Sequence, residues 1–156
     1  MKKKLFLMWA LLSMSASMLA DGLTATLQQG DEMQAFFGAN AFKQAYEAAD
    51  SGAVITLSAG NFNSVTTIKK SITLIGAYAF DTSTGHARST FFENNVYIEA
   101  NNIHLEGIYF GANLYLGAIS NCHIKRCKIE KELAANDIHT NTLMDQCITL
   151  LSPLAI

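Results

Sequence analysis

The segment Ile103-His-Leu-Glu-Gly-Ile-Tyr-Phe110 holds two short runs, 103–106 and 108–110, in which apolar and other residues alternate. The same arrangement returns as Cys122-His-Ile-Lys125 before Cys127-Lys-Ile129, and as Thr142-Leu-Met-Asp145 before Cys147-Ile-Thr149. Alternation is the period of a β-strand. Strands that recur at a near-constant step, here about 20 residues, predict coils stacked side by side.

Short triplets extend this pattern along the chain at a similar step. They are Ile55-Thr-Leu57, Ile72-Thr-Leu74, Thr90-Phe-Phe92, Ile108-Tyr-Phe110, Cys127-Lys-Ile129 and Cys147-Ile-Thr149. We expect the first and third residue of each triplet to face inward and all six to form one wall. The runs 96–98 and 114–116 are separated by the same step and supply another wall. Three strands per turn predict an all-β, three-sided parallel β-solenoid of about six coils.

Asn102, Asn121 and Asn141 directly precede three of these strands and so repeat at the same step as the strands. Asparagine tolerates left-handed backbone angles and hydrogen-bonds within turns. We expect the three side chains to stack at one corner and to bond to one another along the stack.

The chain is predicted to divide into three parts. Residues 1–20 have a basic start and an apolar run from Leu5 to Leu12, the pattern of a secretory signal peptide. Residues 21–40 form a leading segment with a short helix or strand. Residues 41–156 form the solenoid, and residues 41–50, apolar at three- and four-residue spacing, form a helix that caps its first coil. Whether the chain is truncated at its C-terminus stays open.

The net charge argues against one class of function, and the cysteine content bears on the chemistry of the thiols. The formal net charge is -2 and no basic patch is present, which argues against nucleic-acid binding. Cys122, Cys127 and Cys147 are an odd number for an exported protein, and Cys127 and Cys147 fall at equivalent inward positions. We expect buried thiols that pack as small hydrophobes, and the disulfide state stays open.

The chain resembles the right-handed parallel β-helix superfamily, the pectate-lyase-like proteins, as a short exported bacterial member. The resemblance rests on Gly52–Phe62 and Ile68–Gly76, on the helix at 41–50 and on the asparagine column. It covers residues 41–150 and implies a right-handed fold. It implies no single activity, because the superfamily includes lyases, hydrolases and adhesins.

Enzymes of that superfamily use clustered acidic residues, with calcium in the lyases. The aspartates here are scattered, so we expect no catalytic residue, no metal and no cofactor, and calcium only if the chain is a lyase. The alternative acid–base set is Glu106, Lys125 and Asp145, with Lys125 between the two carboxylates, where it would lower their pKa values. His104 and His123 stack beside them but lack a third metal ligand.

The predicted ligand contacts are Phe91, Tyr109 and Lys128. Phe91 and Tyr109 are expected to be exposed neighbours on one wall, flanked by Thr73 and Lys128, where aromatic rings can stack on a sugar or dock a partner. The alternative is that residues 77–89 cover Phe91.

These features favour an exported, non-catalytic β-helix protein, periplasmic, cell-surface or secreted, that presents a wall to a polysaccharide or a cell-surface protein. A second interpretation of these features is that the chain is the N-terminal part of a larger β-helix protein. Self-association through an open C-terminal edge is a further expected interaction. The alternative is a polysaccharide lyase or glycoside hydrolase acting on a pectin-like substrate, or an inactive remnant of one. No transmembrane segment is expected after the signal peptide is removed.

Overall fold

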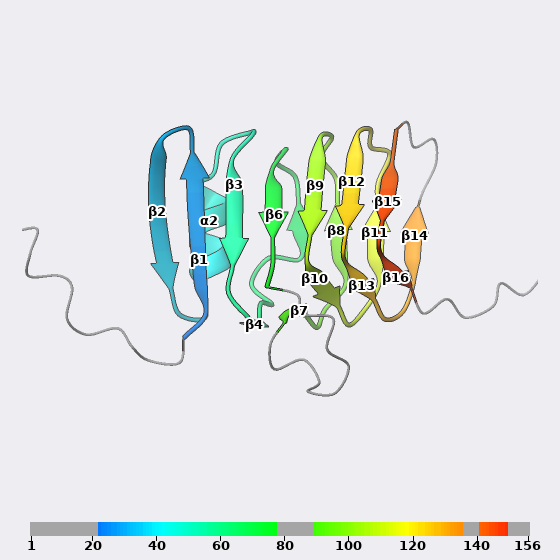
Figure 1. Ribbon diagram of the computed structural model, residues 1–156, viewed down its shortest axis with the longest axis horizontal. Coiled ribbons are helices and arrows are strands. Elements are labelled where there is room, and N and C mark those ends of the chain that lie inside the picture. Colours follow the sequence, from blue (N-terminus) through cyan, green and yellow to red (C-terminus); the bar gives the residue numbers. More distant parts are fainter. Residues whose placement is uncertain (1–21, 78–88, 136–140, 150–156) are drawn as a thin grey trace, which may run out of the picture.

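The computed structural model describes residues 22–77, 89–135 and 141–149 and shows a parallel β-solenoid with a short helix near its N-terminal end (Figure 1). The predicted signal peptide, residues 1–20, lies outside the described residues. Each full turn contributes one strand to each of three walls, as the sequence predicts.

The first wall is a seven-stranded sheet in the order β15-β12-β9-β6-β3-β1-β2. Its strands are β1 (Thr24–Gln29), β2 (Glu32–Phe37), β3 (Val54–Leu57), β6 (Thr73–Ile75), β9 (Ile103–Glu106), β12 (Cys122–Lys125) and β15 (Leu143–Asp145). The second wall runs β16-β13-β10-β7-β4. Its strands are β4 (Gly60–Asn61), β7 (Thr90–Phe92), β10 (Ile108–Phe110), β13 (Lys128–Ile129) and β16 (Ile148–Thr149). The third wall runs β14-β11-β8-β5. Its strands are β5 (Thr67–Ile68), β8 (Val96–Ile98), β11 (Leu114–Leu116) and β14 (Leu133–Ala135).

The prediction that all six triplets form one wall is wrong. The first two triplets belong to β3 and β6 of the first wall, whereas the other four belong to the second wall. The step from Ile72 to Thr90 matches the repeat in length but crosses from one wall to the next, because residues 77–89 are inserted between β6 and β7. The solenoid therefore has about four turns, the number of strands in the third wall, rather than six.

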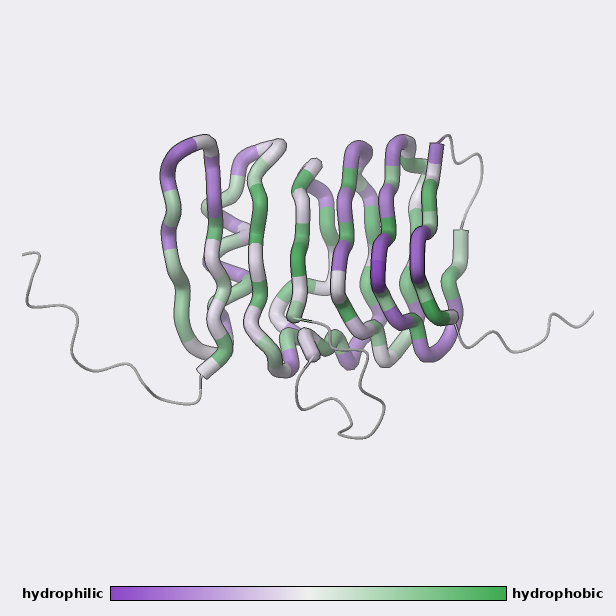
Figure 2. Tube along the Cα trace, in the orientation of Figure 1, coloured by the Kyte–Doolittle hydropathy of each residue, from purple (hydrophilic) through white to green (hydrophobic). Residues whose placement is uncertain are grey.

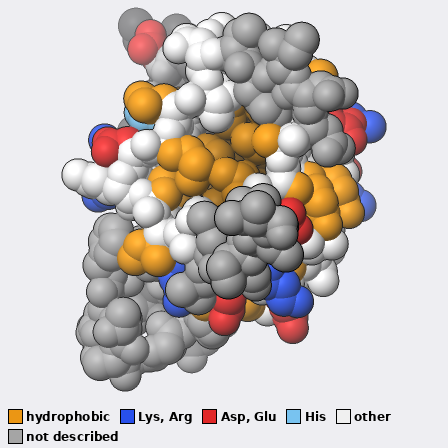
Figure 3. Space-filling view, turned by 90° about the vertical axis from the view of Figure 1, so that its right-hand side faces the viewer, with side chains coloured by type: hydrophobic (Ala, Val, Ile, Leu, Met, Phe, Trp, Pro, Cys, Tyr) orange, Lys and Arg blue, Asp and Glu red, His pale blue; other side chains and the backbone are white. Residues whose placement is uncertain are grey.

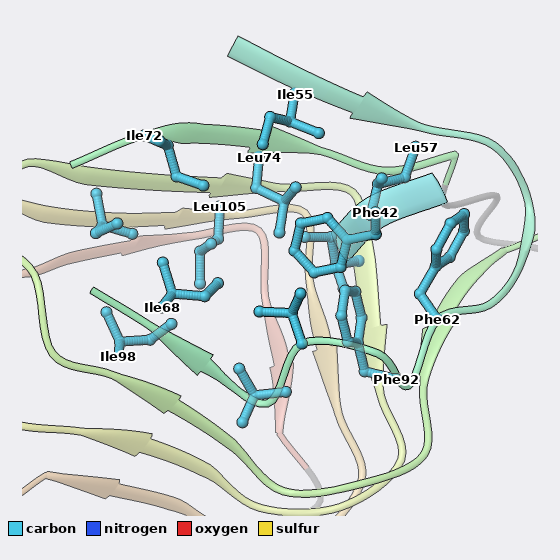
Figure 4. Close-up of a cluster of buried hydrophobic side chains, with 14 of the residues drawn as sticks. Phe42, Ile55, Leu57, Phe62, Ile68, Ile72, Leu74, Phe92, Ile98 and Leu105 are labelled. Carbon is cyan, nitrogen blue, oxygen red and sulfur yellow. The ribbon is translucent and has the colours of Figure 1, made fainter. Parts of the chain in front are cut away.

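Apolar columns run through the inside of the three walls (Figure 4). In the first wall Ile55, Leu74, Leu105 and Ile124 are consecutive partners in the register, and all are fully buried. Burying such a side chain contributes about 1.5–3 kcal/mol, so the columns are the main source of stability. Hydrophilic residues lie at the upper corners of the later turns in Figure 2.

A helix and a hairpin close the N-terminal end. The helix α2 (Ala41–Ala48) confirms the predicted cap and buries Ala41, Phe42 and Ala45. The Phe42 ring contacts the rings of Phe62 and Phe92 at centroid distances of 6.4 and 5.7 Å. The leading segment forms an antiparallel hairpin of β1 and β2, and β1 pairs antiparallel with β3. This hairpin adds two strands to the first wall.

The predicted asparagine column is present at the corner before β9, β12 and β15. Asn102, Asn121 and Asn141 have φ angles of 54°, 55° and 59°. The Nδ2 of Asn121 donates to the Oδ1 of Asn102 at 2.9 Å, and Asn141 donates to Asn121 at 2.9 Å. The same three asparagines thus provide both the left-handed backbone of this corner and the ladder of side-chain hydrogen bonds along it.

The C-terminal end is apolar at its centre (Figure 3). Met144 continues the column of Leu105 and Ile124 but is 38% exposed. Leu143 and Ile148, which continue the outward columns of His123 and Lys128 on the last strands of the first and second walls, are 56% and 39% exposed. Among the described residues no strand pairs with the outer edges of β14, β15 and β16. Within the described part of the chain, α2 and the hairpin cover the N-terminal end, and no described strand covers the C-terminal end.

Candidate functional site

The second wall brings Phe91, Tyr109 and Lys128 together in register, as predicted. The rings of Phe91 and Tyr109 are 5.1 Å apart at 78°, an edge-to-face pair. Thr73 does not flank them, because it lies in β6 of the first wall, where it pairs with His104. Asn61 of β4 takes that place beside Phe91.

Tyr109 is buried rather than exposed, with 4% of its surface accessible. The ammonium of Lys128 lies 4.4 Å from the Tyr109 ring centroid and donates to its hydroxyl at 3.2 Å. That hydroxyl donates to Glu130 at 2.6 Å. A cation over an aromatic face is itself a stabilising contact, so this cluster is already engaged in contacts within the chain.

Gly111 shows why the Phe91 ring lies where it does. A Cβ added at Gly111 would collide with the Cζ and Cε2 atoms of Phe91. The glycine on the neighbouring turn therefore makes room for the aromatic ring, and the ring packs onto backbone.

The first wall aligns Glu106, Lys125 and Asp145 as predicted. The Glu106 carboxylate has three positive or proton-donating partners. They are His104 Nε2 at 3.0 Å, Arg126 Nη2 at 2.6 Å and Lys125 Nζ at 3.7 Å. The Glu106 side chain is only 17% exposed.

The hydrogen bond to His104 is the largest influence on the pKa of Glu106, which lies below its ordinary value. Burial opposes this effect, while Arg126 and Lys125 reinforce it. The predicted direction is confirmed for Glu106, but the main cause is His104 rather than Lys125. A carboxylate held ionised in this way suits an ion-pair network and not a general acid.

Sequence reasoning missed Arg126 as a partner of Glu106. Arg126 follows β12 at a second left-handed corner, with φ of 49°, where Gly107 and Gln146 have φ of 67° and 51° in the neighbouring turns. The signal was present in the pairs 106–107, 125–126 and 145–146, which recur at the same steps as the strands. Of the three corner residues, Gly107, Arg126 and Gln146, only the glycine is a residue type that by itself indicates a left-handed turn.

His104 and His123 are neighbours in the register of the first wall, as predicted, and their rings meet edge to face, with centroids 4.7 Å apart at 73°. The Nε2 of His123 is buried without a hydrogen-bond partner. Within the described ranges no group of three or more His, Cys, Asp or Glu side chains could hold a metal ion.

The cysteines are free in the structure, and burial raises the pKa of Cys122 to about 11 and that of Cys127 to about 12. Cys147 is half-buried, and its Sγ donates to the carbonyl oxygen of Ile124 at 3.2 Å. Thiols with raised pKa values are poor nucleophiles at neutral pH. Cys122 and Cys127 therefore pack as small hydrophobes.

The third wall carries an aromatic pair that sequence reasoning used only to define a wall. Tyr97 and Tyr115 are the middle residues of β8 and β11 and are direct partners in the register. Their rings are nearly parallel, at 9°, with centroids 4.8 Å apart. Tyr97 is 40% exposed and Tyr115 is half-buried. We call Tyr97 and Tyr115 the tyrosine pair.

The tyrosine pair lies at a shallow pocket of about 160 Å³, which is also lined by Ile98, Glu99, Leu116 and Gly117. Carbon atoms in contact lie about 3.5–4.0 Å apart, so parallel rings with centroids 4.8 Å apart touch when they are displaced sideways. Tyr97 and Tyr115 both keep part of their surface accessible to solvent. The outer neighbours in the register are Thr67 and Ala134, which are smaller.

No helix among the described residues is long and apolar enough to cross a membrane. Comparisons with protein-family models, with curated proteins and with solved structures found no match to the chain.

Proposed function

We propose that the chain is an exported, non-catalytic β-helix protein, right-handed and similar to the pectate-lyase-like proteins, that binds a polysaccharide on its third wall. The observation that carries this proposal is the tyrosine pair beside its shallow pocket. Tyrosine combines a flat apolar ring with a polar tip, which suits a sugar with its C–H faces and hydroxyl edges. The basic and apolar pattern of residues 1–20 supports export.

The tyrosine pair is a better candidate than Phe91, Tyr109 and Lys128. Tyr109 is buried under contacts made by the chain itself, whereas Tyr97 is 40% exposed. A stable protein interface needs more than about 1,000 Å² of buried surface with a hydrophobic centre. The pocket is small, and one of its lining residues, Glu99, carries a charge and forms an ion pair with Lys69. Both points favour a sugar chain over a protein partner.

The alternative, a polysaccharide lyase or glycoside hydrolase, would depend on Glu106, Lys125 and Asp145. The ion-pair network around Glu106 favours a structural role for this set. Calcium would enter only through the lyase alternative.

Affinity electrophoresis in gels that contain soluble polysaccharides tests the proposal. We expect the wild type to be retarded and Tyr97→Ala and Tyr115→Ala to lose the retardation. Phe37→Ala is the matched control, because Phe37 is 51% exposed on β2, away from the third wall. Release of unsaturated products or new reducing ends from the same polymers, with or without calcium, would contradict the non-catalytic proposal.

A further inference from the structure

The charges around the tyrosine pair identify the class of polysaccharide. Building on the proposed function, we propose that the third wall selects an uncharged polysaccharide and rejects polymers that carry carboxylates. Three features of the surface support this specificity: the charge of the pocket, its hydrogen-bonding groups and the positions of the cations elsewhere.

Among the residues that the structure describes, one charged side chain lines the pocket, the carboxylate of Glu99, and no lysine or arginine does. Lys69 lies nearby, but its ammonium is 3.3 Å from Glu99 Oε2 and is paired with it. An acidic polymer would bring a carboxylate on each sugar toward Glu99 without a free cation to meet it. Recognition of carboxylates in proteins normally uses arginine or lysine donors.

The hydrogen-bonding groups suit hydroxyls. Asn113 Nδ2 donates to the hydroxyl oxygen of Tyr115 at 2.8 Å, so the O–H of Tyr115 is left to donate outward. Glu99 meets Lys69 through one oxygen, and its other oxygen can accept from a ligand hydroxyl. Gly117 has no side chain to fill the space beside Glu99. Aromatic surface, one donor and one acceptor therefore lie together.

Of the cations in the later turns, three are engaged on other walls, and the fourth, Lys131, is exposed before β14 and does not line the pocket. Lys125 and Arg126 contact Glu106 on the first wall, and Lys128 contacts Tyr109 on the second. The second-wall aromatic residue Tyr109 thus has a cation over its ring, whereas among the described residues no cation lines the pocket beside the tyrosine pair. That contrast is what charge complementarity to a neutral ligand requires.

The experiment compares two polymers that share a backbone, hydroxyethylcellulose and carboxymethylcellulose, with xyloglucan and polygalacturonate as a second pair. Affinity electrophoresis at low salt should give binding to the neutral member about tenfold tighter than to the acidic member. Glu99→Gln removes the acceptor charge and frees Lys69, so it should weaken neutral binding and strengthen acidic binding. Glu47→Gln, on the exposed face of α2, is the matched control and should change neither.

The outcomes separate the two proposals. Binding that depends on Tyr97 and Tyr115 but prefers the acidic polymers would overturn the neutral specificity and leave the proposed function standing. Absence of binding to every polymer would overturn both. Neutral binding that survives replacement of both tyrosines, in variants with wild-type circular dichroism, would place the site elsewhere, which overturns this inference and the third-wall site but leaves polysaccharide binding itself standing.

Discussion

Lys70 holds the end of the cap helix. Its ammonium donates to the carbonyl oxygens of Tyr46, Glu47 and Ala49 at 2.8, 3.0 and 2.7 Å. These carbonyls lie at the C-terminal end of α2, where they lack partners within the helix and carry partial negative charge. We expect Lys70→Met to lower the free energy of unfolding by about 1–3 kcal/mol, because charge-assisted hydrogen bonds are lost while the aliphatic stem remains.

Urea denaturation measures this effect. Lys69→Met is the matched control, since the side chains of Lys69 and Glu99 are 68% and 49% exposed and their ion pair is a surface contact. Exposed pairs contribute about 0–1 kcal/mol. Equal losses in the two variants would show that the carbonyl contacts of Lys70 add nothing to stability.

Glu106 makes the stability of the first wall depend on pH. Its pKa is lowered in the folded protein, chiefly by the hydrogen bond from His104. The stabilisation is therefore present above the pKa of an unfolded glutamate, about 4.3, and is lost as the pH falls through the lowered folded value. We expect Glu106→Gln to be less stable than the wild type at pH 7 and the difference to shrink below pH of about 4.

Urea midpoints at a series of pH values measure the difference between the two proteins. Glu47→Gln is the control, because the Glu47 side chain is 64% exposed, and it should follow the wild type at every pH. A difference between wild type and Glu106→Gln that stays constant from pH 7 to pH 3 would contradict this account.

At the scale of the elements, two left-handed corners hold the turns of the first wall. Asn121 and Gln146 have φ angles of 55° and 51°. A left-handed backbone conformation costs residues other than glycine about 1–2 kcal/mol, so a change to glycine removes this cost. Asn121→Gly also removes the two side-chain hydrogen bonds of the asparagine ladder. We expect Asn121→Gly to lower the free energy of unfolding, and we expect Gln146→Gly to leave it higher than Asn121→Gly does by about 1 kcal/mol or more. Thermal unfolding of the two variants measures the difference. The reverse order would show that the ladder adds no stability.

The elements also show how far the sequence predicts this structure. Period-two runs and the asparagine step predicted parallel coils, because inward packing and left-handed corners constrain residue type. The hairpin of β1 and β2 was missed, since its two-residue turn, Gly30 and Asp31, joins strands with many polar residues. The placement of the triplets that begin at Ile55 and Ile72 in the second wall failed, because the insertion at residues 77–89 makes the step from Ile72 to Thr90 about as long as one turn. The partners of Glu106 and the exposure of Tyr97 depend on side-chain geometry, and the spacing of residues along the sequence does not determine that geometry.

For the whole molecule, burial along one column predicts where the solenoid is strong. Ile124 is fully buried, whereas Met144, the next residue of the same column, is 38% exposed. We expect Ile124→Ala to cost about 2–5 kcal/mol, the usual range for a buried large-to-small change, and Met144→Ala to cost about 1 kcal/mol or less. Urea denaturation of the two variants measures the contrast. Equal costs would mean that Met144 is covered in solution.

The exposed end leads to a last prediction, that two copies associate through their C-terminal ends. Leu143 and Ile148 are 56% and 39% exposed there, and the outer edge of β15 lacks a partner strand among the described residues. A two-fold axis through Met144 would pair β15 antiparallel with its copy and set Asp145 opposite Leu143, so that like charges do not meet directly. Sedimentation velocity should show a concentration-dependent dimer in the wild type.

Leu143→Asp with Ile148→Asp should abolish that dimer, because the introduced carboxylate at position 143 would lie opposite Asp145 of the other copy, and like charges directly opposite one another destabilise a strand pair. The control is Met33→Asp with Phe37→Asp at the opposite end, on the exposed side of β2, where the two residues are 67% and 51% exposed. The control changes the net charge equally, so a dimer lost in both variants would indicate general repulsion rather than a C-terminal interface. A dimer that dissociates only with the control pair would place the contact at the hairpin, where β2 is the other edge strand of the first wall.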